Sequence, residues 1–153
     1  ALFEACLTRS QTLAQPETYS HRYPTSSQMR EWVEEPIAYR IEYIDGMKAT
    51  MLMMNGLVGD FTVAARIKGQ AAPLSTLFYL PPVPNVAYSA ELMAKAEATF
   101  MTGKSPCPLE RTLLTTGLVE ACVHSVGKGQ ARIETPHLAI EYAVSPESTW
   151  ARE

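Results

Sequence analysis

A segment of alternating residues that ends in a tight-turn signal most constrains how this chain can fold. Residues 37–43 place Ile and Tyr at every second position, which is the period of a β-strand with one buried face. Asp45-Gly46 is a dipeptide that favours a hairpin turn, and a second apolar segment follows at residues 47–55. The sequence therefore predicts an antiparallel β-hairpin over residues 37–55.

The second predicted strand is apolar on both faces. Its run Met51-Leu-Met-Met54 leaves no polar face, which is typical of a central strand that is covered from both sides. Helices of the same chain can cover one face, and we expect another copy of the chain to cover the other. The next predicted strand, at residues 58–68, presents Phe61 with the same alternation. The candidate interface residues are therefore Met51, Met53, Met54 and Phe61.

The remaining segments complete an α+β pattern. We expect two helices in residues 1–35, the sheet in 36–81, two further helices in 86–127 and a last strand in 131–144. Prolines after Leu80 end the sheet, because proline has no backbone N–H for strand pairing. The prediction is a single domain over residues 1–153, with an open, mostly antiparallel sheet, helices packed on one face and the other face available for association.

Length and composition fit a folded protein that needs neither disulfide nor metal. At 153 residues, the chain can bury roughly 70% of the surface that its unfolded form exposes. Hydrophobic residues make up 46% and charged residues 19%, an apolar excess that often accompanies a partner interface. We therefore expect a homo-oligomer, with a dimer favoured.

Charge and cysteine usage argue against several classes of partner. The net charge is -3 and the 13 Lys and Arg residues are scattered, so neither nucleic acid nor a membrane is expected as a partner. The three cysteines form no Cys-x-x-Cys pair, which suits a reducing compartment. Since the sequence also lacks a run of ~18 apolar residues and a basic leader, the expected location is cytoplasmic.

Two blocks in the second half of the chain give it a family resemblance. They read Pro108-Leu-Glu-Arg-Thr-Leu-Leu-Thr-Thr-Gly117 and Arg132-Ile-Glu-Thr-Pro136. Together with residues 34–46 and 51–61, they resemble the glucose-fructose oxidoreductase, inositol dehydrogenase and MocA-type oxidoreductase family. The similarity is to the distal part of the C-terminal domain, without the nucleotide-binding domain. It implies an open sheet whose free face commonly mediates subunit association, and NAD or NADP as the cofactor of a full-length member.

The chain lacks the residues that this family's chemistry requires. A dinucleotide fingerprint needs glycines after a first strand, whereas Gly127-Lys-Gly129 follows a predicted helix and reads as its stop. The Glu-Lys-Pro segment that bears the family's usual catalytic lysine is absent. Neither Asp45 nor Asp60 is followed four positions later by His, so the family's Asp and His pair cannot be assigned. We expect no catalytic residue, no cofactor-binding residue and no cofactor in this chain.

Three residues are candidates for a substrate-side role. His21 lies in a polar loop that could close over a ligand or serve only as ordinary loop structure. Arg111 lies in the first turn of a predicted helix, and it either ties that helix to the sheet through Glu134 or Glu141 or contacts substrate or a missing domain. His124 lies near the end of that helix, where a cation is favoured structurally. The histidines do not have metal-ligand spacing, so no metal site is expected.

Three functions remain open from the sequence. The first is a non-catalytic association domain of a dehydrogenase-like protein that dimerises through its sheet. The second is the substrate-side part of an NAD(P)-dependent sugar or polyol oxidoreductase whose dinucleotide-binding domain is missing or lies on another chain. The third is a free-standing module that binds a small ligand between sheet and helices.

Overall fold

The computed structural model describes residues 1–16, 23–80 and 86–144. The chain divides into two compact units, Ala1–Leu80 (unit 1) and Pro81–Glu153 (unit 2), and each has its own internal packing. The expectation of a single domain over residues 1–153 stays a prediction.

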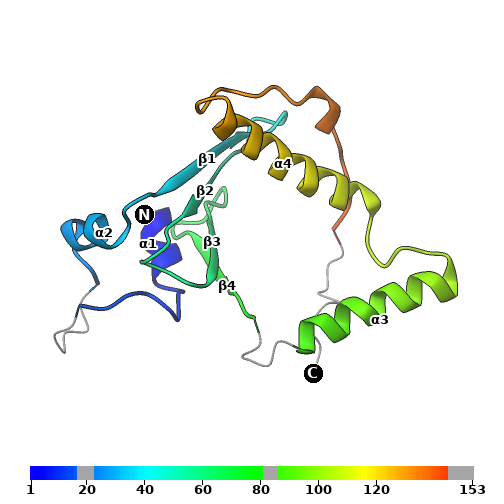
Figure 1. Cartoon of the computed structure of the whole chain (residues 1–153), viewed down its shortest axis with the longest axis horizontal. Helices are drawn as coiled ribbons and strands as arrows, with labels where there is room; N and C mark the ends of the chain where they lie inside the picture. Colours follow the sequence, from blue (N-terminus) through cyan, green and yellow to red (C-terminus); the bar gives the residue numbers. More distant parts are fainter. Residues whose placement is uncertain (17–22, 81–85, 145–153) are drawn as a thin grey trace. The chain divides into compact units, whose positions relative to one another are not determined.

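Helices and antiparallel strands share the chain, which confirms the predicted α+β class (Figure 1). Unit 1 contains α1 (Leu2–Leu7), α2 (Ser26–Trp32), β1 (Ile37–Glu42), β2 (Lys48–Met53), β3 (Phe61–Ala65) and β4 (Leu74–Phe78). Unit 2 contains α3 (Val86–Thr102), α4 (Leu109–Gly127) and the short 3-10 helix η1 (Pro136–Leu138). Within the described residues the strands form two separate antiparallel pairs, β1–β2 and β3–β4, instead of one sheet.

A capping box starts α2. The Gln28 N–H donates to Thr25 Oγ1 at 3.3 Å, and the Thr25 N–H donates to Gln28 Oε1 at 2.9 Å, so two helix-end donors are satisfied reciprocally. The helix ends where the Val33 N–H donates to the Met29 carbonyl oxygen. Met29 and Trp32 of this helix pack against the core of unit 1.

The β1–β2 hairpin forms where the alternation and the Asp45-Gly46 turn predict it. Gly46 has a φ of 86°, which lies in the left-handed region that such a turn requires. The expectation of a central, doubly covered second strand is wrong for the described residues, because β2 pairs with β1 alone and Met51 and Met53 are 47% and 42% exposed.

A tight turn follows β2. The N–H groups of Leu57 and Val58 both donate to the Met54 carbonyl oxygen, and Gly56, which lies inside this turn, has a φ of 94°. After the turn, β3 pairs with β4 and not with β2. The same turn inserts Leu57, 1% exposed, into the core.

The core of unit 1 brings together three distant segments. Leu7, Val33 and Leu57 are its buried residues, and the partly buried side chains packed around them are Phe3, Leu13, Met29, Trp32, Met54 and Val58. Gly56 makes this approach possible, because a Cβ at that position would overlap the Trp32 carbonyl oxygen. The turn at Gly56 and the end of α2 thus touch through their backbones.

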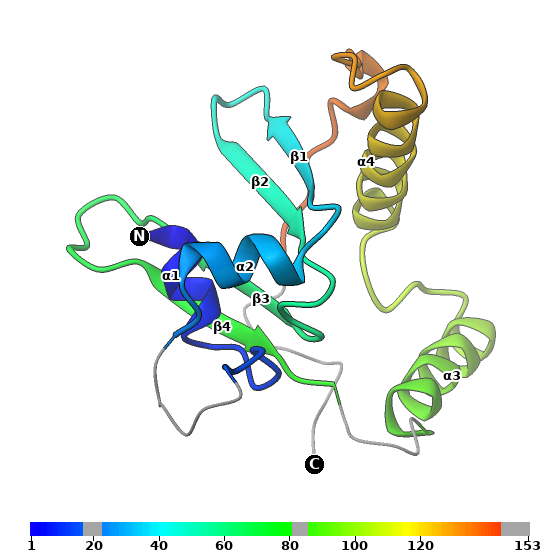
Figure 2. The same cartoon turned by 60° about the vertical axis from the view of Figure 1, so that its left-hand side comes forward.

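Helix α1 covers one face of the β3–β4 pair (Figure 2). Thr62, Ala64, Ser75 and Leu77 share that face by alternation and are half-buried. Arg9, just after α1, donates from Nε to Ser75 Oγ at 3.0 Å. The prediction of helices on one sheet face therefore holds for β3–β4, through α1.

Asp60 ties the loop after α1 to the start of β3. Its Oδ2 accepts the N–H groups of Gln11 at 2.6 Å and Thr12 at 3.2 Å, while Thr12 Oγ1 accepts the Gly59 N–H at 2.8 Å. Burial alone would raise the pKa of Asp60, but these donors and the nearby hydroxyls of Ser10 and Thr12 outweigh it, and the pKa lies below its ordinary value.

Replacing Asp60 by Asn is expected to lower the free energy of unfolding by about 1–2 kcal/mol near neutral pH, because hydrogen bonds to a charged acceptor are lost. Since the folded-state pKa is depressed, the contribution is complete above the unfolded-state pKa and is lost as pH falls through the folded-state pKa. Urea unfolding of both proteins should show the gap closing below about pH 4. A gap that persists at lower pH would show that the charge is not responsible.

In unit 2, residues 131–144 do not form the predicted strand, and η1 within them contacts α4. Pro136 begins η1, and its missing N–H could not support strand pairing. Leu138 is buried against Gly117, where an added Cβ would lie 2.9 Å from Leu138 Cδ1 and closer still to Cδ2. The glycine in the first family-like block therefore allows a close approach of the following chain segment.

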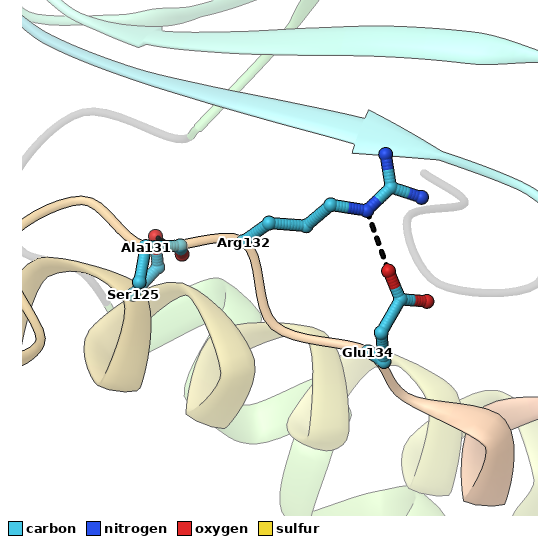
Figure 3. A network of polar contacts seen from close by, with 4 residues as sticks. All are labelled: Ser125, Ala131, Arg132 and Glu134. Carbon is cyan, nitrogen blue, oxygen red and sulfur yellow. Dashed lines mark hydrogen bonds and ion pairs between the residues drawn. The ribbon is translucent and has the colours of Figure 1, made fainter.

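The end of α4 has the glycine stop that its sequence predicts. Gly129 and Gln130 both have positive φ, and the Gln130 N–H donates to the Ser125 carbonyl oxygen at 2.7 Å. Ser125 Oγ donates to the Ala131 carbonyl oxygen at 2.7 Å, and Arg132 Nε pairs with Glu134 Oε1 at 2.5 Å (Figure 3). These contacts hold the residues that follow α4, before the chain returns to the helix where Leu138 meets Gly117.

Candidate association surface

The side of β3–β4 opposite α1 is apolar and exposed. We call it the outer face; by strand alternation and register it consists of Phe61, Val63, Ala65, Leu74, Thr76 and Phe78. The exposed fractions are 61% for Phe61, 60% for Leu74, 57% for Phe78 and 42% for Val63. None of these residues is charged. A contiguous surface of this kind is typical of an interaction site.

The β1–β2 hairpin has a second apolar face. Cross-strand partners share a face, so Met51 lies beside Tyr39 and Met53 beside Ile37. The opposite face is mixed: it has the apolar pair Ala38–Leu52 and, at its other end, Lys48 Nζ lies 3.8 Å from Glu42 Oε1. Charged residues are therefore confined to one face of this hairpin.

The four predicted interface residues occupy three different environments. Met51 and Met53 lie on the apolar face of β1–β2, and Phe61 lies on the outer face of β3–β4. Met54 is partly buried against the core of unit 1, because the chain turns there. Sequence reasoning missed Phe78 as the cross-strand partner of Phe61, although the alternation through residues 74–80 contained the signal.

The substrate-side candidates are not brought together. Arg111 is exposed in the first turn of α4 and His124 is exposed in its last turn. They are thirteen positions apart on the helix, which is about 20 Å along its axis and too far for both to hold one small substrate. His21 lies outside the described residues.

Within the described residues, Arg111 forms no ion pair with its proposed partners Glu134 and Glu141. Glu134 is paired with Arg132 instead. Arg111 is held through its backbone, whose N–H donates to the Pro108 carbonyl oxygen at 3.1 Å.

The described residues give little support to a ligand or metal site. Within ranges 1–16, 23–80 and 86–144, no three His, Cys, Asp or Glu side chains are grouped so that they could hold a metal ion. A hollow in unit 2 is lined by α3 alone, including Met93, Glu97 and Phe100. One helix supplies no opposite wall, so this hollow is exposed helix surface. None of the described helices has the length and apolarity needed to span a membrane.

Comparisons with protein-family models, with curated proteins and with solved structures find no match to this chain. The oxidoreductase-family resemblance therefore stays a prediction.

Proposed function

We propose that this chain is a non-catalytic association domain that forms a homodimer through the outer face of β3–β4. The observation that supports the proposal is this uncharged face, on which four large side chains are 42–61% exposed. Helix α1 already covers the opposite face. A partner on the outer face would complete a sheet that is covered on both sides.

The size of the surface is compatible with a dimer. A fully exposed large apolar side chain contributes about 150–200 Å². On that scale, the outer face with the flanking Ile67 and Leu80 exposes about 500–600 Å² of apolar surface per copy. Standard interfaces bury about 800 Å² per partner, part of it polar. An isolated two-stranded sheet is marginally stable in water, so association would also stabilise unit 1.

The family-like blocks support a proposal about the parent protein. We place the chain in the distal C-terminal part of an oxidoreductase of the glucose-fructose oxidoreductase and inositol dehydrogenase type. Hydride transfer with NAD or NADP would then belong to a dinucleotide-binding domain outside these residues. This chain would contribute assembly and scaffold.

The test introduces a charge into the outer face. Replacing Phe78 by Glu should weaken the homodimer at least about 100-fold, because each subunit would bury an unpaired carboxylate. Sedimentation velocity over a range of micromolar concentrations measures the dissociation constant. The wild-type protein should be a dimer under these conditions.

Phe100→Glu is the matched control, since Phe100 on α3 is 88% exposed and undergoes the same chemical change away from the sheet. It should leave the dissociation constant within about threefold of wild type. A wild-type protein that stays monomeric would refute the proposal. So would a dimer that Phe78→Glu leaves intact and Phe100→Glu dissociates.

A further inference from the structure

We infer that the two copies meet about a two-fold axis that runs in the plane between their outer faces. The axis crosses the strands at right angles and passes beside Val63 and Thr76. The inference rests on the proposed function and adds the register of the dimer. In this arrangement, β3 of one copy crosses over β3 of the other with its direction reversed. Phe61 then packs over the partner's Ala65.

The side-chain sizes along the outer face lead to this register. Its three cross-strand pairs are Phe61–Phe78, Val63–Thr76 and Ala65–Leu74. The face is therefore bulkiest at the Phe61–Phe78 end, and its smallest side chain, Ala65, lies at the opposite end of β3. Packed sheets keep a nearly constant separation of about 10 Å, so large side chains fit best opposite small ones.

A two-fold axis along the strands gives a poorer fit. It would place the Phe61–Phe78 pair of one copy over the same pair of the other, so four aromatic rings would crowd one end. The opposite end would then have Ala65 facing the partner's Leu74 across a gap. The crosswise axis instead distributes the four rings over both ends, with Val63 meeting its own counterpart at the centre.

The absence of charge supports a second copy as the occupant. Any two-fold contact brings residues near the axis against themselves, and a charged residue there would meet a like charge. The outer face has none. A strongly charged partner would find no complementary group on this face.

Two single substitutions test the register. Phe61→Ala should weaken the homodimer at least about tenfold by leaving Ala opposite Ala, and Ala65→Phe should weaken it similarly by placing Phe opposite Phe. An equimolar mixture should recover a heterodimer within about threefold of wild-type affinity, because both contacts again join one Phe and one Ala. Fluorescence-detected sedimentation with one variant labelled measures the heterodimer.

Intramolecular compensation cannot explain such a recovery. The two positions lie about 13 Å apart on one strand, and the variants are on separate chains.

Ala65→Leu replaces Ala65→Phe if the latter lacks the wild-type circular dichroism spectrum. A wild-type dimer without preferential heterodimer formation overturns the crosswise axis but leaves the proposed function intact. A monomeric wild-type protein overturns both.

Discussion

Replacing Gly56 by alanine is expected to lower the free energy of unfolding of unit 1 by about 3 kcal/mol or more. The φ of 94 at this residue is unfavourable for any L-amino acid with a side chain. In addition, the new Cβ would overlap the Trp32 carbonyl oxygen and lie 3.2 Å from its carbon. A backbone carbonyl cannot rotate away as a side chain can, so the turn itself would have to move.

Gly46→Ala separates conformational strain from this close approach. Gly46 has a similar φ of 86, yet an added Cβ would meet nothing within 4 Å. Its replacement should therefore cost only about 1–2 kcal/mol. Urea unfolding at fixed protein concentration, followed by Trp32 fluorescence in a Trp150→Phe background, compares the two variants. Equal losses would contradict the contact between Gly56 and Trp32.

Leu57→Ala should destabilise unit 1 by about 2–4 kcal/mol. The side chain is 1% exposed at the centre of a core with few fully buried residues, so neighbouring groups can fill only part of the resulting cavity. Leu52→Ala is the matched control, because Leu52 is an exposed leucine on β2 and should cost below about 1 kcal/mol. The same fluorescence-monitored unfolding applies to both. Comparable losses would mean that Leu57 is not central to the core.

Local chemistry made most helices and strands predictable. The alternation in β1, the Asp45-Gly46 turn and Gly129 after α4 act over a few residues, and the structure has these features at the expected places. The expected single sheet required more than local patterns. The strand with which β3 pairs is a tertiary property: it pairs with β4, and the turn at Gly56 before it contacts the distant Trp32.

The candidate surface was only partly predictable for the same reason. Phe61 was recognisable from alternation, but its pairing with Phe78 depends on the register of β3 and β4. Met54 reads like Met51 and Met53 in the sequence, yet the turn directs it towards the core. Similarly, residues 131–144 read as a last strand, whereas the packing of Leu138 on Gly117 appears only in three dimensions.

We expect the Asp60 linkage to form late in folding, because it joins segments that lie far apart in the sequence. The loop at Gln11 and Thr12 finds its hydrogen-bond partners almost fifty residues later in the chain, beside the Leu57 that completes the core. A nascent chain that ends before this point contains α1 and α2 but lacks Leu57, which completes the core around Leu7 and Val33. We therefore expect unit 1 to resist protease only once residues up to β3 have left the ribosome.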